Sequence, residues 1–165
     1  DGDERLRFHK IHPFSLVGEE KLYGAGDELV TIEVGGLRVT PLICYDLRFP
    51  EPFRIAAGRT DLFLVIANWP STRGDAWQAL LRARAVENQW FVLGVNRVGV
   101  AEGIAHRGDS ALIDPWGAYR MSLSEREGLV GGEIDPDDVR KARERFSFLA
   151  DRRPGVYRRL EEQEN

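Results

Sequence analysis

The chain has a single cysteine, Cys44, among its 165 residues, so it cannot form an internal disulfide bond. It lacks an apolar run long enough to span a bilayer, and its first ten residues carry too many charges for a signal peptide. Charges of both signs are interspersed, the net charge is −4, and there is no long basic block. This composition disfavours nucleic-acid or membrane-surface partners. We expect a protein of the reducing cytoplasm, although one thiol is compatible with either compartment.

The composition is that of a globular domain. A chain of 165 residues with 42% hydrophobic residues can form one domain with a core of ordinary size. Its three histidines are scattered without the spacing of metal ligands, and no carboxylate pair completes a zinc or iron site. The glycine-rich stretches lack the strand-to-helix context of a phosphate loop. We therefore expect no metal and no other cofactor.

Apolar patterns divide the chain into alternating strands and helices, which is typical of a layered α/β fold. Strands are predicted at Leu6–Lys10, Leu29–Val34, Leu37–Ile43, Asp61–Ala67, Trp90–Val95, Gly108–Ile113, Tyr119–Leu123 and Gly128–Ile134. Helices are predicted at Glu51–Ala57, Asp75–Gln89 and Pro136–Arg145. Gly35 and Gly36, between the second and third strands, predict the turn of a β-hairpin.

Cys44 directly follows the apolar run Val39–Ile43, and Pro50 is well placed to open a helix after it. We therefore expect the thiol on a turn between a buried strand and a helix. Unpaired backbone N–H groups and the helix dipole would stabilise a thiolate and an adjacent oxyanion there. Asp46 is expected to anchor the turn through backbone N–H groups. A lone cysteine in this position is more often an inert buried residue, so its position alone leaves both roles open.

Three separated motifs favour the catalytic role of Cys44 over the inert one. In chain order they are HKIHPF, ICYDLRFPE and NWPSTRGDAWQALLRARAVENQWFVLGVNRVG. Together they resemble the nitrilase-related carbon–nitrogen hydrolases, most closely their omega-amidase branch, from about Phe8 to about Phe148. The resemblance implies the four-layer α-β-β-α sandwich of that family, of which this chain would hold the second half. Residues 1–148 would be the C-terminal portion of the hydrolase domain. Residues 149–165 would be a tail that docks on a partner subunit or covers the edge of its own sheet.

The resemblance also implies catalytic roles. Cys44 matches the nucleophile of the family, and Lys10 matches the cation that holds the oxyanion of the tetrahedral intermediate. Glu19 matches a supporting glutamate, with Glu20 as the alternative if the loop is one residue out of register. No residue before Lys10 matches the general-base glutamate of the family. We therefore expect the C-terminal portion of a longer enzyme, inactive or nearly so by itself.

The expected substrate-binding residues follow the ends of two predicted strands. The backbone N–H of Tyr45 would face the oxyanion. Arg48 lies where a guanidinium could bind a carboxylate with two hydrogen bonds, which fits the short dicarboxylic monoamides on which omega-amidases act. Asn68 and Trp69 would form the pocket wall, because the strand before them ends at the same sheet edge as Cys44.

The reaction that this resemblance implies is hydrolysis of the omega-amide of a 2-oxo dicarboxylic acid monoamide, such as 2-oxoglutaramate. Water and this small amide would react through a cysteine acyl-enzyme, with release of ammonia. The same residues would serve an N-carbamoyl amine hydrolase or a deaminated-glutathione amidase. A non-catalytic interaction domain that has lost the first half of the fold is a further alternative. The resemblance also implies a homodimer or higher homo-oligomer.

Overall fold

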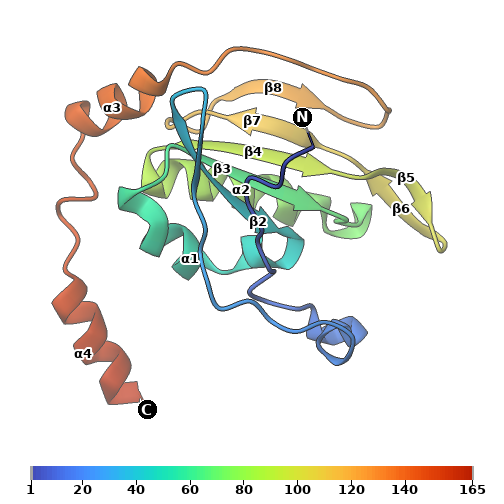
Figure 1. Ribbon diagram of the computed structural model, residues 1–165, viewed down its shortest axis with the longest axis horizontal. Coiled ribbons are helices and arrows are strands. Elements are labelled where there is room, and N and C mark those ends of the chain that lie inside the picture. Colours follow the sequence, from blue (N-terminus) through green and yellow to red (C-terminus); the bar gives the residue numbers. More distant parts are fainter. Residues whose placement is uncertain (1, 165) are drawn as a thin grey trace.

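The computed structural model describes residues 2–164 and is organised around one mixed β-sheet (Figure 1). Its six strands lie in the order β1-β2-β3-β4-β7-β8. Strands β2, β3 and β4 are parallel, and the other neighbours are antiparallel. The strands are β1 (Ile32–Val34), β2 (Leu37–Ile43), β3 (Leu62–Ala67), β4 (Phe91–Asn96), β7 (Ser110–Ile113) and β8 (Tyr119–Leu123). A separate hairpin consists of β5 (Val98–Ala101) and β6 (Ile104–Arg107).

Helices connect the parallel strands, as parallel pairing requires. The α-helices are α1 (Pro50–Ile55), α2 (Gly74–Asn88), α3 (Pro136–Arg145) and α4 (Pro154–Glu164). The short 3-10 helices are η1 (Ser15–Val17), η2 (Glu19–Lys21), η3 (Cys44–Arg48), η4 (Ala56–Gly58) and η5 (Ser71–Arg73). In Figure 1, α1 and α2 cover one face of the sheet, whereas α4 lies apart from it. No helix within residues 2–164 is long and apolar enough to cross a membrane.

The main core lies between the sheet and the helices α1 and α2. Phe63 of β3 packs against Phe53 of α1 and against Trp90, with ring centroids 4.7 and 4.2 Å apart. Gly94 of β4 permits α2 to approach closely, because a Cβ atom there would lie 2.5 Å from Leu81 Cδ1. Close packing of this kind fixes the ends of the parallel strands relative to one another.

The opposite face of the central strands is more open. Ile66 and Val95 are about half exposed, whereas Val65 beside Ile66 in β3 is fully buried on the helical side. Alternation along a strand sends successive side chains to opposite faces, so each face is continuous across the sheet. Helices α1 and α2 thus form a layer on one face of the sheet, whereas Val139 of α3 packs in a second, smaller core cluster with Leu62, Phe91 and Leu112.

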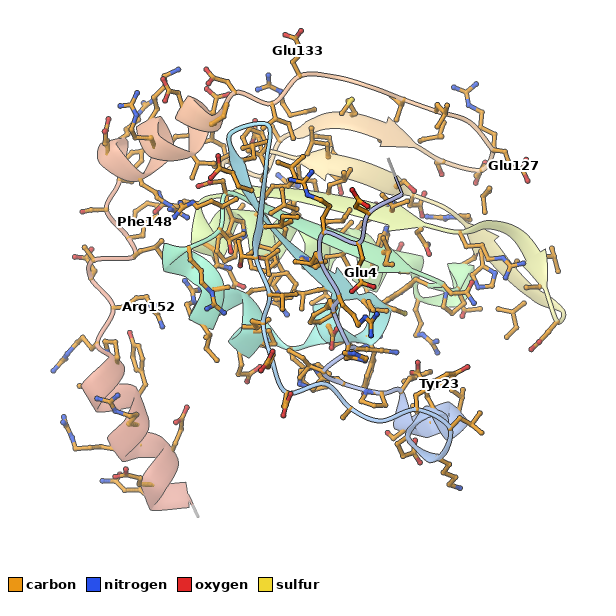
Figure 2. All side chains as sticks on the ribbon, in the orientation of Figure 1. Glu4, Tyr23, Glu127, Glu133, Phe148 and Arg152 are labelled. Carbon is orange, nitrogen blue, oxygen red and sulfur yellow. The ribbon has the colours of Figure 1, made fainter. Side chains whose placement is uncertain are left out.

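Most of the predicted elements are confirmed within one to three residues at each end, including the hairpin across Gly35 and Gly36. Two predicted strands are wrong. Leu6–Lys10 has irregular backbone, and its alternating pattern reflects burial of Phe8 against the core rather than strand pairing. Gly128–Ile134 is also irregular and lies on the long connection between β8 and α3, where Figure 2 shows Glu127 and Glu133. Its three glycines weaken any strand preference.

Two elements were not predicted. The β5–β6 hairpin turns at Glu102 and Gly103, which both have positive φ. Its arms of four residues are too short to give a distinct alternating pattern. Helix α4 lies in the tail, beyond a connection on which Figure 2 shows Phe148 and Arg152.

Candidate active site

Cys44 lies at the carboxyl end of β2, where the strand turns sharply into η3. Its φ of 47° is in the left-handed region, which is costly for a residue with a side chain and recurs at functional turns. Strands β2 and β3 are parallel, with Ile43 opposite Ile66, so Asn68 beyond β3 reaches the same edge as Cys44. Carboxyl ends of parallel strands are where α/β folds bind ligands.

Asp46 anchors this turn, as predicted. Its fully buried carboxylate accepts a hydrogen bond from the backbone N–H of Ile43 at 3.0 Å. It also accepts from the backbone N–H of His12 at 2.8 Å, and the Nδ1 atom of the His12 ring lies 2.9 Å away. The His12 ring stacks on Phe49 with centroids 3.8 Å apart. One carboxylate thus joins the Lys10 segment to the Cys44 turn.

A second buried side chain supports η3 from the helical layer. Arg84 of α2 is 5% exposed, and its Nη2 atom donates to the carbonyl oxygens of Leu47 at 2.9 Å and Arg48 at 3.1 Å. Its guanidinium also lies over the ring of Phe53. Arg84 was not predicted to matter. The available signal was an arginine in the middle of a helix whose neighbours pack into the core.

Lys10 and Glu19 form a close ion pair, with Nζ and Oε2 2.5 Å apart. The same oxygen of Glu19 accepts the backbone N–H of Phe14 at 2.6 Å. Burial opposes ionisation of Glu19, but the bonds from Lys10 and Phe14 hold the pKa of its carboxyl below the ordinary value. Of the two glutamates considered for this position, Glu19 is therefore the one that pairs with Lys10.

The thiol of Cys44 is not stabilised as a thiolate by the turn alone, which corrects the expectation from sequence. Burial raises the pKa of Cys44 above its ordinary value, and the charges of Glu19 and Asp46 act in the same direction. A backbone hydrogen bond from Asn68 and the charge of Lys10 oppose this rise without cancelling it. Helix α1 also does not follow Cys44 directly, because the 3-10 helix η3 lies between the start of the turn and α1. Within the described residues, burial thus outweighs the groups that favour the thiolate.

Cys44 opens onto a pocket of about 340 Å³ that also contains all four expected substrate-binding residues. This volume suits a small organic molecule. The described residues that line it are Phe14, Leu16, Cys44, Tyr45, Arg48, Asn68, Trp69, Pro70 and Arg73. Lys10 and Glu19 influence the Cys44 thiol through their charges, whereas the described pocket wall consists of other residues.

The wall formed by Trp69 is held in place from β4. Asn96 accepts the backbone N–H of Trp69 at 2.7 Å and donates to its carbonyl oxygen at 3.0 Å. The indole N–H of Trp69 donates to the carbonyl oxygen of Arg73 at 2.8 Å, and the guanidinium of Arg48 lies 4.9 Å from the Trp69 ring centroid. Sequence reasoning missed Arg73 and Phe14. The signal for Arg73 was its position between Asn-Trp-Pro and a predicted helix, at the sheet edge already assigned to the pocket.

Within residues 2–164, no group of three or more His, Cys, Asp or Glu side chains is placed to hold a metal ion. The site's charged groups are the Lys10–Glu19 pair, Asp46 and the pocket arginines Arg48 and Arg73. Such an arrangement offers a nucleophile, a cation and an anion-binding wall.

Known proteins are similar to this chain in sequence and in fold. The family model for carbon–nitrogen hydrolases matches residues 1–144. The omega-amidase YafV of Escherichia coli (strain B / BL21-DE3) is 43% identical over 146 residues, which are 87% of this chain and 57% of that protein. The 2-oxoglutaramate amidase of Bacillus subtilis (strain 168) is 39% identical over 159 residues, which are 95% of this chain and 61% of that protein. The chain thus spans little more than half the length of these relatives.

A solved structure gives the same result at the level of the fold. The CN-hydrolase superfamily protein XC1258 from Xanthomonas campestris, whose active site carries an arsenic adduct, matches with a TM-score of 0.83 and 41% identity. The match covers 87% of this chain and 57% of that chain. This likeness confirms the predicted α/β class, and the layers described above are consistent with part of an α-β-β-α sandwich. On sequence and structure together, this chain belongs to the carbon–nitrogen hydrolase family.

Proposed function

We propose that this chain is the nucleophile-bearing part of an amidase that hydrolyses a small aliphatic amide through a cysteine acyl-enzyme. The observation that carries the proposal is the position of Cys44. Cys44 lies at the end of strand β2, on a strained turn, and lines a pocket, and the charges of Lys10 and Glu19 act on its sulfur. We propose the activity for the full-length enzyme, meaning a polypeptide that contains this chain and a counterpart of the remaining part of the omega-amidase relatives.

In the proposed mechanism, the Cys44 sulfur attacks the amide carbonyl carbon and ammonia leaves, which produces a thioester. Water then cleaves the thioester and restores the thiol. Lys10 and the backbone N–H of Tyr45 stabilise the oxyanion, a role worth about 3–4 kcal/mol per donor in enzymes of known mechanism. The raised pKa of Cys44 means that a base must take its proton. Glu19 already accepts from Lys10 and Phe14 and therefore acts as a positioning residue. We propose that a carboxylate from the part of the relatives' length that this chain does not span takes this proton.

The proposed substrate is the omega-amide of a 2-oxo dicarboxylic acid monoamide, such as 2-oxoglutaramate. The support comes from Arg48, whose guanidinium is stacked on Trp69 at the wall of the Cys44 pocket. A guanidinium held in this way can bind a carboxylate through two parallel hydrogen bonds. The names of the similar proteins from Escherichia coli and Bacillus subtilis agree with this substrate class.

The test is ammonia release by the full-length enzyme from 2-oxoglutaramate, an N-carbamoyl amine and deaminated glutathione. We expect 2-oxoglutaramate to be hydrolysed fastest, and we expect Cys44→Ser to lose at least about 1,000-fold in kcat/KM, because the nucleophile is removed. Intact mass analysis of an acid-quenched reaction should detect the thioester only in the enzyme that retains Cys44. No ammonia release from any of these compounds would favour the interaction-domain alternative.

A further inference from the structure

We infer that Arg73 acts together with Arg48 as a two-arginine clamp for the anionic end of the substrate, which makes Arg73 a specificity-determining residue. The clamp selects short amides whose far end carries a carboxylate with a neighbouring oxygen acceptor, and it disfavours neutral amides. This inference rests on the proposed function, because it concerns the pocket into which Cys44 opens.

Both arginines line the Cys44 pocket, and each guanidinium lies against an aromatic ring. Arg48 Cζ lies 4.9 Å from the ring centroid of Trp69, and Arg73 Cζ lies 5.6 Å from that of Phe14. Stacking on an aromatic face orients a guanidinium and leaves its N–H edge available for oxygen acceptors. Both arginines therefore contribute guanidinium donors to the lining of one cavity.

No carboxylate neutralises this clamp among the residues that the structure describes. Neither Arg48 nor Arg73 has an ion-pair partner there, and the described lining of the pocket contains no Asp or Glu. By contrast, Arg38 and Arg107 are each paired with an aspartate within 3 Å. Two uncompensated guanidinium groups in a concave site favour an anionic ligand.

The backbone that carries the clamp is fixed from both sides. The carbonyl oxygen of Arg73 accepts the indole N–H of Trp69, and the carbonyl oxygen of Arg48 accepts Nη2 of Arg84. Arg73 also directly precedes α2, whose positive dipole end adds to the charge at that wall. Donors on a fixed backbone discriminate better between ligands than donors on a mobile loop, because less ordering is required on binding.

The chemistry of two guanidiniums defines the ligand class. One guanidinium binds a carboxylate through two hydrogen bonds and leaves a lone pair on each oxygen, so a second guanidinium can bind the same carboxylate and an oxygen acceptor beside it. A 2-oxo group beside a carboxylate supplies that acceptor, whereas an unsubstituted aliphatic amide supplies neither. We therefore assign Arg48 to the carboxylate and Arg73 to a position shared by the carboxylate and the adjacent oxygen.

The test compares alkylation of Cys44 by N-iodoacetylglycine and N-iodoacetylglycinamide in the full-length enzyme, with the Cys44 peptide quantified by mass spectrometry. With both reagents the sulfur forms a bond to carbon and iodide leaves, but only N-iodoacetylglycine carries a carboxylate, at the same distance of four bonds from the reacting carbon as in 2-oxoglutaramate. We expect the ratio of the N-iodoacetylglycine rate to the N-iodoacetylglycinamide rate at Cys44 to exceed that of free N-acetylcysteine. Arg73→Gln should lower this ratio about tenfold, since a hydrogen bond between charged groups is lost. Arg73→Lys should lower it less.

Arg159→Gln, which removes the same charge from the exposed face of α4, is the matched control and should leave the ratio unchanged. An unchanged ratio in Arg73→Gln would overturn the clamp while leaving the reactive thiol in place. Equal slowing of both reagents would also overturn it, because that result indicates a merely structural role for Arg73. A Cys44 that reacts with neither reagent would overturn the proposed function and the clamp together.

Discussion

The short 3-10 helix η3 and the connection formed by residues 124–135 both lie outside the α-helices and strands. They differ in burial and in the polar contacts that hold their backbones. In η3, Asp46 and Leu47 are fully buried, and buried polar groups bind the backbone from two sides. In the connection, nearly every residue is exposed and Leu129 is fully exposed. Irregular backbone is therefore not equivalent to loose backbone. The segment that carries the thiol is fixed by polar groups that are expensive to leave without partners.

Among the substitutions that test this contrast, Asp46→Ala is expected to have the largest effect. This change leaves the backbone N–H groups of Ile43 and His12 without their acceptor in a buried site. We expect a loss of about 3 kcal/mol in the free energy of unfolding. Urea denaturation of the full-length enzyme measures it, and hydrogen exchange should show faster exchange at residues 43–48. Asp46→Asn, which keeps one acceptor oxygen, should lose less. Equal stability of the alanine variant and the wild type would contradict the anchoring role.

An intermediate effect concerns the ionisation of the thiol on the fixed turn. Burial raises the pKa of Cys44, while the charge of Lys10 lowers it, so Lys10→Met should raise it further. The thiolate is the reacting form and becomes populated as pH rises through this pKa. The midpoint of the iodoacetamide rate profile for this chain should therefore move to higher pH in Lys10→Met. Lys21→Met removes an exposed charge from the same loop and serves as the control. A midpoint that moves to lower pH would contradict the assigned charge contribution.

The smallest effect is expected in the exposed connection. Leu129→Ser should change the free energy of unfolding by no more than about 0.5 kcal/mol, because the side chain is fully exposed. The same substitution at Leu47, which is fully buried in η3, should cost about 3 kcal/mol. Thermal or urea unfolding of the two variants compares the segments directly. Similar losses at both positions would remove the distinction between them.

The sequence alone predicts those parts of the molecule that depend on local patterns. Continuous apolar runs locate β3 and β4, Gly35 and Gly36 locate a hairpin, and the ends of β2 and β3 locate the pocket walls at Cys44 and Asn68. These predictions succeed because strand ends at one edge of a parallel sheet converge regardless of side-chain detail.

Features that depend on burial or on distant partners are not readable from local patterns. Leu6–Lys10 alternates like a strand but has no strand partner in the described chain, so its pattern gives the wrong element. The direction of the pKa shift of Cys44 follows mainly from burial, which the tertiary fold determines. Arg73 and Phe14 meet only because η5 folds back toward the Lys10 segment, and no spacing in the sequence indicates that contact.

The buried carboxylate of Asp46 accepts hydrogen bonds from both of the segments that carry Lys10 and Cys44. His12 contacts this carboxylate through its backbone N–H and through its ring, and the ring also stacks on Phe49. A displacement of one segment therefore displaces the other. The backbone segments that carry Lys10 and Cys44 are thereby fixed relative to each other. Under the proposed function, substitutions at the pocket rim, such as at Leu16 or Pro70, would therefore change which molecule fits the pocket while Cys44 and Lys10 keep their positions.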